Sequence, residues 1–196
     1  MRIISGKAGG ITLSVPKGEV RPTTDRVREA VFSILNPLMD RADVLDLFAG
    51  SGAFGLEALS RGARDARIWQ PVLRGEKPFS CAAARANLVK TGLEGGTVIQ
   101  GDAVQFVRRE LLAGRKYDII FADPPYCKGP ADRDFIVELA EAGVAGLLKG
   151  GGVFIAEVQE GWGTGREGAA EIDGLNLVDN RRYGKNMLLF YQLPEK

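Results

Sequence analysis

The residues best suited to chemistry are Asp123-Pro124-Pro125-Tyr126, which follow an apolar run at 117–122. Two consecutive prolines lack N–H donors and stiffen the backbone, which leaves the Pro124 carbonyl facing outward as an acceptor. With the Asp123 carboxylate, that carbonyl can bind both hydrogens of a planar exocyclic amine. Tyr126 offers a flat face on which a nucleobase can stack. We therefore take these four residues as catalytic candidates that prepare an amine as nucleophile; the alternative is a rigid turn packed against Tyr126.

A second group of special residues lies in the stretch 43–55, DVLDLFAGSGAFG. Its apolar start is typical of a buried strand, and the residues after it have helical character. Between them, Gly50, Gly52 and Gly55 have the G-x-G-x-x-G spacing of a nucleotide-binding corner. Gly50 permits the tight turn, Gly52 lets a ligand approach the backbone, and the helix N–H groups favour electron-rich groups. An ordinary strand-to-helix turn is the alternative.

The elements that position these residues form an alternating pattern of strands and helices. The alternation predicts an α/β fold with right-handed crossovers and a mostly parallel seven-stranded sheet. The last two strands lie too close in sequence for a helical crossover, so we expect an antiparallel hairpin at the sheet edge. The glycine-rich run 161–168 is expected to be a surface loop. Expected strands are 43–48, 66–69, 97–100, 117–122, 152–158, 175–179 and 187–192, and expected helices are 54–61, 77–91, 103–113 and 132–148.

Residues 1–39 are predicted to form an extension ahead of a domain at 40–196. Glycines and β-prone pieces at 2–4 and 11–13 favour a small hairpin, and a helix is expected to begin at Thr24 or Asp25. The segment from Met1 to Arg28 has six basic and two acidic side chains, a net charge of +4. Such a patch suits a polyanionic partner, although a solvated surface has the same composition.

Composition limits the classes of site and of protein. The 196 residues are 45% apolar and 26% charged, as in one globular domain. Histidine is absent, which excludes Ser-His and Cys-His pairs and argues against catalytic zinc. Cys81 and Cys127 form neither a disulfide framework nor a metal-binding spacing. Because no membrane-length apolar run or signal-peptide core is present, we expect a cytoplasmic protein.

In an open α/β sheet, ligands bind beyond the carboxyl ends of the strands. Those ends carry Asp46 with its glycine loop, Gly101-Asp102-Ala103, and Asp123 to Tyr126. Several polar or special residues at one sheet edge indicate a ligand site, although Asp102 alone can serve as a helix cap.

The combination of D-x-F-x-G-x-G and D-P-P-Y resembles the Rossmann-like S-adenosylmethionine-dependent amino-methyltransferases. The segments RIISGKAGG, RPTTDRVREAVFSIL, LDLFAGSGAFGLEALSRGA and RRYGKNMLLFY resemble more narrowly the RsmD-type 16S rRNA guanine-N2 methyltransferases, nearly end to end. The resemblance implies methyl transfer from S-adenosylmethionine to a guanine 2-amino group. The implied partner is 16S rRNA or the small ribosomal subunit. Apart from the resemblance, we expect a monomer that binds no metal.

The resemblance also implies roles for individual residues. Asp46 would hold the methionine amino group, the 50–55 loop would cradle the cofactor, and Asp102 would meet the adenine. Asp123, Pro124 and Tyr126 would grip the target base. The cofactor-binding candidates are Asp46, Phe48, Gly50, Ser51, Gly52, Gly55, Gln70, Asp102 and Ala103, and the RNA-binding candidates are Arg2, Lys7, Arg21, Arg26, Arg28, Arg182 and Lys185.

Gln70 departs from the nucleotide-binding pattern. An acidic residue ordinarily ends the second strand and binds both ribose hydroxyls, but a glutamine stands here, 20 residues past Gly50. Charge-assisted hydrogen bonds are about twice as strong as neutral ones, so we expect cofactor affinity to fall by about 1–2 kcal/mol. The segment 71–78, PVLRGEKP, is also irregular where a helix start is expected.

Three other functions are therefore considered. A degenerate family member would bind RNA without methylating it, which Gln70 favours. An adenine-N6 methyltransferase would use the same Asp-Pro-Pro-Tyr grip, because that motif recognises an exocyclic amine rather than one base. A nicotinamide-dependent oxidoreductase shares the glycine loop but leaves Asp123 to Tyr126 unexplained.

Overall fold

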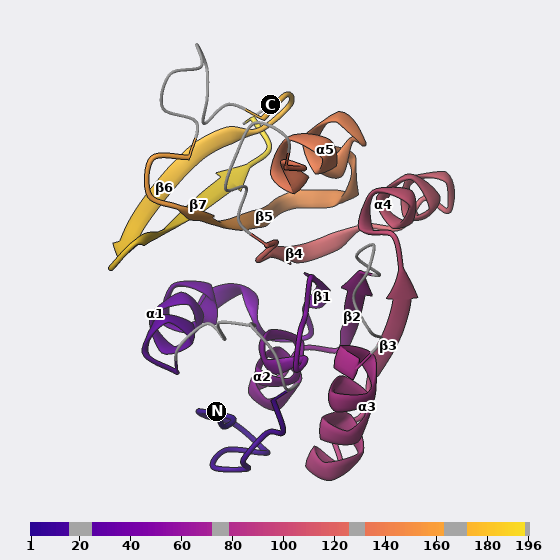
Figure 1. Ribbon diagram of the computed structural model, residues 1–196, viewed down its shortest axis with the longest axis vertical. Coiled ribbons are helices and arrows are strands. Elements are labelled where there is room, and N and C mark those ends of the chain that lie inside the picture. Colours follow the sequence, from indigo (N-terminus) through magenta and orange to yellow (C-terminus); the bar gives the residue numbers. More distant parts are fainter. Residues whose placement is uncertain (16–24, 72–78, 126–131, 163–171, 195–196) are drawn as a thin grey trace. The chain divides into compact units, whose positions relative to one another are not determined.

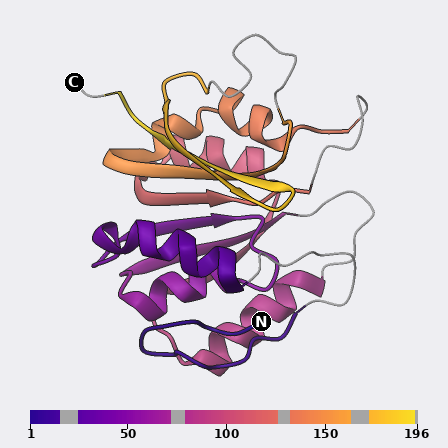
Figure 2. The same cartoon turned by 90° about the vertical axis from the view of Figure 1, so that its left-hand side faces the viewer.

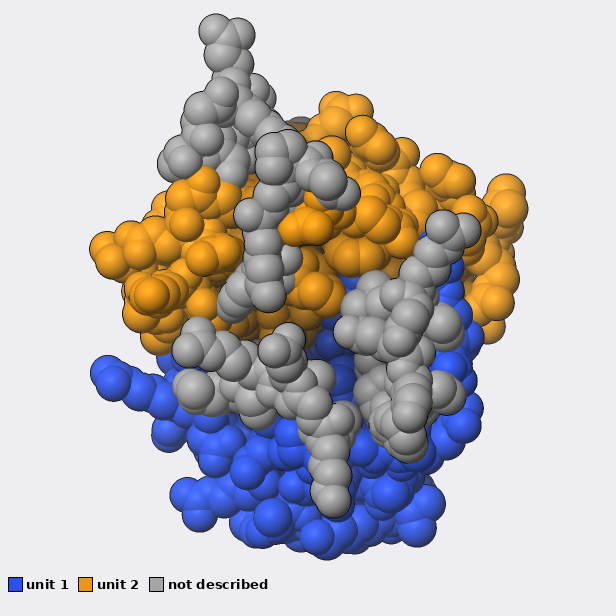
Figure 3. Space-filling view, viewed as in Figure 1, with its two compact units in different colours: residues 1–102 blue, residues 103–196 orange. Residues whose placement is uncertain are grey.

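The protein forms two compact units of strands and helices, residues 1–102 and 103–196 (Figures 1 and 3). The expected division at residues 39 and 40 stays a prediction. The computed structural model describes residues 1–15, 25–71, 79–125, 132–162 and 172–194, with the backbone alone at 69–71 and 79–80.

The first unit is built on three parallel strands, β1 (Asp43–Leu47), β2 (Asp65–Pro71) and β3 (Gly96–Gly101). Their spatial order is β3-β2-β1, with Asp43 beside Asp65 and Ala66 beside Gly96 (Figure 1). Parallel neighbours need long crossover connections. Helices α2 (Ala53–Arg61) and α3 (Phe79–Thr91) supply them and pack on these strands.

Helix α2 is the central helix of the first unit, with eight of its nine residues buried. It contacts β1 and β2, and its Phe54 ring lies 4.7 Å from that of Phe32 in α1 (Asp25–Leu35). Each large apolar side chain buried in this way contributes about 1.5–3 kcal/mol. Asn36-Pro37 ends α1 in a single 3₁₀ turn, η1 (Asn36–Leu38), as expected from proline. The corner that follows β1 is therefore held by a well-packed helix.

The second unit contains the parallel pair β4 (Tyr117–Ala122) and β5 (Leu148–Gln159), which lie side by side in Figures 1 and 2. The strand order continues with β7 (Asn186–Gln192) and β6 (Asn176–Tyr183). Strand β7 is antiparallel to both neighbours, so the predicted edge hairpin is confirmed. Its two-residue turn contains Gly184 at φ +64°, as such turns require. Helices α4 (Ala103–Leu112) and α5 (Phe135–Glu141) complete the unit.

Several expected elements have other bounds in the structure: the strands expected at 152–158 and 175–179 are the longer β5 and β6. The predicted helix at 132–148 is too long, because α5 ends at Glu141 and Gly143 takes φ +89°. One 3₁₀ turn, η2 (Val144–Leu147), then leads directly into β5, whose first residue, Leu148, is the last of the expected helix. The expected N-terminal hairpin is present as a short antiparallel pairing, with Arg2 bridged to Thr12 and the amides of Ile3 and Leu13 donating to the carbonyls of Ile11 and Met1 at 2.9 and 3.0 Å.

Helix α1 begins at Asp25, one of the two expected starts, while Thr24 lies outside the described residues. Among the described helices, none is long and apolar enough to cross a bilayer.

Candidate active site

The corner between β1 and α2 has an unusual backbone. Phe48, Gly50 and Gly52 take φ values of +62°, +54° and +78°, all in the left-handed region. The Gly52 N–H donates to the Ala49 carbonyl at 2.7 Å and closes the turn. For Phe48 this conformation costs roughly 1–3 kcal/mol, and such strain clusters at ligand-binding sites. The sequence had predicted the role of the glycines but not the strained phenylalanine.

Steric contacts explain why glycine stands at positions 52 and 55 of the corner. A Cβ at Gly55 would lie 2.7 Å from Cγ1 of the buried Ile68, so only glycine lets α2 approach β2 this closely. A Cβ at Gly52 would lie 3.3 Å from that of Ala84, on a backbone that side chains rarely adopt. The close contact at Gly55 agrees with the helix–strand packing role of the last glycine in a nucleotide-binding corner.

Asp46 supports the corner from within β1. It is 1% exposed, and its Oδ2 accepts a hydrogen bond from the Gly55 N–H at 3.0 Å. Burial raises the pKa of Asp46 to about 7, and the bond from Gly55 opposes that rise. Asp46 therefore braces the start of α2 and titrates near neutral pH.

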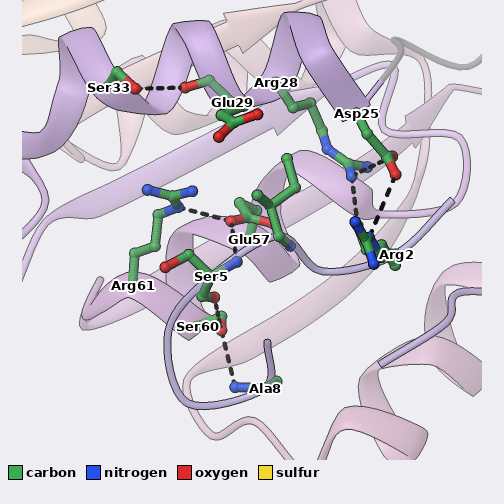
Figure 4. A network of polar contacts seen from close by, with 11 residues as sticks. Arg2, Ser5, Ala8, Asp25, Arg28, Glu29, Ser33, Glu57, Ser60 and Arg61 are labelled. Atoms are coloured by element: carbon green, nitrogen blue, oxygen red, sulfur yellow. Dashed lines mark hydrogen bonds and ion pairs between the residues drawn. The ribbon is translucent and has the colours of Figure 1, made fainter. Parts of the chain in front are cut away.

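The N-terminal segment is attached to α2 through two buried side chains (Figure 4). Glu57 is fully buried and accepts hydrogen bonds from the amides of Ile4, at 2.7 Å, and Ser5, at 3.1 Å. Ser60 Oγ accepts from the Ala8 amide at 3.0 Å and donates to the Ser5 carbonyl at 2.5 Å. The segment that carries the basic patch is therefore fixed to the helix that begins at the glycine corner.

Asn87 attaches the same segment to the corner itself. Its side-chain amide donates to the carbonyls of Ser14 and Ser51, each at 2.9 Å, and its Oδ1 accepts from the Ser14 N–H at 2.8 Å. Asn87 is fully buried, so these bonds are shielded from water. The Ser51 hydroxyl also contacts the sulfur of Met1 at 3.1 Å.

The carboxyl ends of β2 and β3 carry the other cofactor candidates. Gln70 is paired with Gln100 in the parallel register, and its side chain lies outside the described residues. Asp102 directly follows β3 and is half-buried, while Ala103 begins α4. Because β1, β2 and β3 are parallel, the glycine corner, Gln70 and Asp102 share one edge of the first unit.

In the second unit, a pocket of about 160 Å³ lies at the carboxyl ends of β4 and β5. Pro124 and Pro125 line it, and the half-buried Asp123 precedes them. Tyr126 lies outside the described residues. The described part of the Asp-Pro-Pro-Tyr motif therefore borders a concave site. The other lining residues are Arg133, Asp134, Phe135, Ile136, Glu157, Val158, Gln159, Glu160, Gly161 and Trp162.

The Asp134 carboxylate fixes the Trp162 side chain on the pocket wall and caps the helix beside it. Asp134 accepts from the indole Nε1 of Trp162 at 2.9 Å and also from the Val137 amide, which caps the start of α5. Beside it, the Arg133 guanidinium lies 4.5 Å from the centre of the Phe135 ring. The pocket thus combines aromatic surface with anchored polar groups, as expected for a site that binds a flat heterocycle.

Sequence reasoning missed Phe135, Glu157 and Trp162 as site residues. Glu157 had a usable signal, because it stands near the carboxyl end of β5, the strand beside β4. Trp162 lies at the start of the run that we expected to be a surface loop; residues 163–168 of that run lie outside the described residues.

The predicted RNA-contacting residues differ in how far their side chains are exposed to solvent. Arg28 is 1% exposed, and its Nη2 donates to the Arg2 carbonyl at 2.5 Å and to Asp25 at 2.9 Å (Figure 4). Its predicted contact with RNA phosphates does not fit this burial, since the guanidinium is withdrawn from solvent. Arg21 lies outside the described residues. The exposed candidates are Arg2, Lys7, Arg26, Arg182 and Lys185.

The family model described as Conserved hypothetical protein 95 matches residues 1–192. The chain belongs to this family. It is 39% identical over 130 residues to Ribosomal RNA small subunit methyltransferase D of Escherichia coli K12, which covers 66% of this chain and 62% of that protein. The match thus spans less than two thirds of that relative. The resemblance to RsmD-type proteins noted from the sequence is confirmed.

Two solved structures are similar to this protein over almost its whole chain. A putative methyltransferase from Escherichia coli is 31% identical with a TM-score of 0.78, covering 98% of this chain and 97% of that one. A hypothetical protein of Thermus thermophilus is also 31% identical, with a TM-score of 0.77 and coverage of 98% and 99%. The predicted Rossmann-like methyltransferase fold is therefore confirmed.

Proposed function

We propose that this protein transfers a methyl group from S-adenosylmethionine to the 2-amino group of a guanine in 16S rRNA. The observation that carries the proposal is the aromatic-walled pocket beside Pro124 and Pro125, in a family with a relative named as a small-subunit rRNA methyltransferase. The substrate is free 16S rRNA or the small ribosomal subunit, and the protein acts as a monomer in the cytoplasm.

The glycine corner fits S-adenosylmethionine. Gly50 and Gly52 take the left-handed conformation that turns the loop, and Asp46 provides an acid next to it. When bound, the cofactor supplies an electrophilic methyl group on a sulfonium. The residues that would hold it are Asp46, Phe48, Gly50, Ser51, Gly52 and Gly55 for the methionine part, Gln70 for the ribose, and Asp102 and Ala103 for the adenine.

Asp123 and the Pro124 carbonyl accept the two hydrogens of the guanine amine, while Pro125 and Tyr126 complete the base site. This arrangement holds the amine lone pair toward the methyl group and restricts its delocalisation into the ring. Catalysis is mainly positioning, because little covalent help from the protein is required. The Asp123 carboxylate also offsets the positive charge that develops on the nitrogen.

Residues 1–39 act as an RNA-facing extension of a methyltransferase domain at 40–196. The support is the net charge of +4 over residues 1–28 and the exposure of Arg2, Lys7 and Arg26. These three residues would contact RNA phosphates, together with Arg21, Arg182 and Lys185. Each contact should add about 0.7–0.9 to the slope of log affinity against log salt concentration.

The deciding experiment incubates the protein with labelled S-adenosylmethionine and either 16S rRNA or small subunits, and then identifies the methylated nucleoside. N2-methylguanosine is expected. Detection of N6-methyladenosine would show that the methylated base is adenine and not guanine. RNA binding without any methyl transfer would favour the alternative of a degenerate family member that binds RNA only.

Asp123→Ala tests the role of the motif. Transfer should fall by about 100-fold or more, because one acceptor of the amine is lost. Calorimetric affinity for S-adenosylmethionine should stay close to wild type. Asp173→Ala, at an exposed acid in the same unit, is the matched control. Full activity of Asp123→Ala would overturn the catalytic assignment.

A further inference from the structure

The pocket at the ends of β4 and β5 contains a buried acid that the proposed mechanism does not use. Glu157 lines the pocket together with Pro124 and Pro125, yet it is only 2% exposed. Burying a carboxylate is unfavourable unless it is hydrogen-bonded. On the basis of the proposed function, we propose that Glu157 is the specificity-determining residue that selects guanine over adenine, by accepting the N1–H of the target base.

The strand register gives Glu157 the right position. Ala122 of β4 is paired with Ala156 of β5, so Asp123 and Glu157 stand one residue beyond the same pair. Asp123 directly follows β4 and Glu157 lies at the equivalent position within β5, while Pro124, Pro125 and Glu157 line the same pocket. A base whose exocyclic amine is bound at Asp123 and Pro124 would present its adjacent ring nitrogen to a group on the next strand.

The geometry of Glu157 is fixed by the edge hairpin. The side-chain amide of Asn186, the first residue of β7, donates to Glu157 Oε1 at 2.5 Å. An ionised carboxylate has about four lone-pair sites, so it can accept this bond and a bond from a ligand at the same time. Asn186 thus orients the carboxylate.

The chemistry of the two purines explains the selection. In guanine, the 2-amino group lies between two ring nitrogens, N1, which carries a hydrogen and donates, and N3, which accepts; we place N1 beside Glu157. In adenine, the ring nitrogen N1 beside the 6-amino group carries a lone pair and accepts. A carboxylate at this place forms a charge-assisted bond with guanine but opposes the adenine lone pair. The same amine grip would therefore accept both bases, and Glu157 would reject adenine.

The test compares RNA with guanine and RNA with 2-aminopurine at the nucleotide that the wild-type protein methylates. 2-Aminopurine keeps the 2-amino group, but its N1 is an acceptor, as in adenine. Glu157→Gln is nearly isosteric, and its amide can donate to that acceptor. For Glu157→Gln, kcat/KM with guanine should fall by about 10- to 100-fold. With 2-aminopurine, kcat/KM should change much less. The ratio of kcat/KM for guanine to kcat/KM for 2-aminopurine should therefore fall sharply.

Thermal unfolding establishes that the variant is folded, and Glu141→Gln, at an exposed acid of α5, is the matched control that should keep the wild-type ratio. If Glu157→Gln keeps that ratio, whether both rates stay or fall together, Glu157 does not read the base and the inference is overturned. Absence of transfer by the wild-type protein would instead overturn the proposed function.

Discussion

The carboxylate of Asp46 accepts a hydrogen bond from the backbone amide of Gly55, with 3.0 Å between Oδ2 and the nitrogen. This bond joins β1 to the first turn of α2 and spans the corner that contains Phe48 and the left-handed glycines. A residue held in a strained conformation persists only where its surroundings fix it. The Asp46–Gly55 bond is one of the contacts that fix this corner.

The first prediction concerns the pH dependence of stability. The pKa of Asp46 rises from 3.8 to about 7 on folding, because burial disfavours the charged form. Its contribution to stability is therefore fully present below about pH 4 and is lost as the pH rises to about 7. Asp46→Asn cannot ionise, so between pH 4 and pH 7 it should gain up to about 4 kcal/mol in unfolding free energy relative to wild type.

Urea unfolding of both proteins without cofactor, at several pH values from 4 to 8, measures this difference. Asparagine keeps an acceptor for the Gly55 amide, so the loss of charge is the main change. A difference that stays constant over the whole range would show that Asp46 is not the titrating group.

The second prediction concerns the packing of α2 on β2. Gly55→Ala would place a Cβ 2.7 Å from Cγ1 of the buried Ile68, and the strand or helix must shift. Such overpacking costs about 1–3 kcal/mol, which exceeds the gain of up to about 1 kcal/mol in helix propensity. Gly150→Ala is the control, since its new Cβ would meet nothing within 4 Å. Thermal unfolding should show a lower Tm for Gly55→Ala alone; an unchanged Tm would contradict the packing argument.

Local sequence patterns predicted the parts of the fold that depend on neighbours in the chain. The strand at 117–122 has the bounds observed for β4, because an apolar run followed by Asp-Pro-Pro leaves little choice. The helix expected at 132–148 ends earlier because Gly143 takes a left-handed conformation, and the apolar residues 144–147 after it form a 3₁₀ turn whose side-chain pattern resembles a continued helix. Periodicity alone does not separate the two.

Contacts between distant residues could not be read from the sequence. Glu57 binds the Ile4 amide across 53 positions, and Asn87 binds Ser14 across 73. No periodic pattern marks such a pair, because each depends on how the whole unit packs. For the same reason, Arg28 looked like part of a basic surface patch although its side chain is buried.

The third prediction concerns the attachment of the N-terminal segment. Different oxygens of Glu57 accept from the amides of Ile4 and Ser5, so Glu57→Gln replaces one of these two acceptors by an NH₂ group, which cannot accept. The unfolding free energy should fall by about 1–3 kcal/mol. Hydrogen exchange should accelerate most at the Ile4 and Ser5 amides, while Glu29→Gln, at an exposed acid of α1, should leave both rates unchanged. Uniform acceleration over the protein would instead indicate general destabilisation.

The fourth prediction concerns the pocket wall, where Asp134 caps α5 and accepts from the Trp162 indole at 2.9 Å. Asp134→Ala should cost about 1–2 kcal/mol through the lost cap and the lost indole bond. Trp162→Phe should cost about 1 kcal/mol in the wild-type background through the lost N–H donor. In the Asp134→Ala background that cost should largely disappear, because the acceptor is already gone. Urea unfolding of the two single variants and the double variant measures the coupling. Strictly additive costs would show that the Trp162–Asp134 bond contributes nothing to the pocket wall.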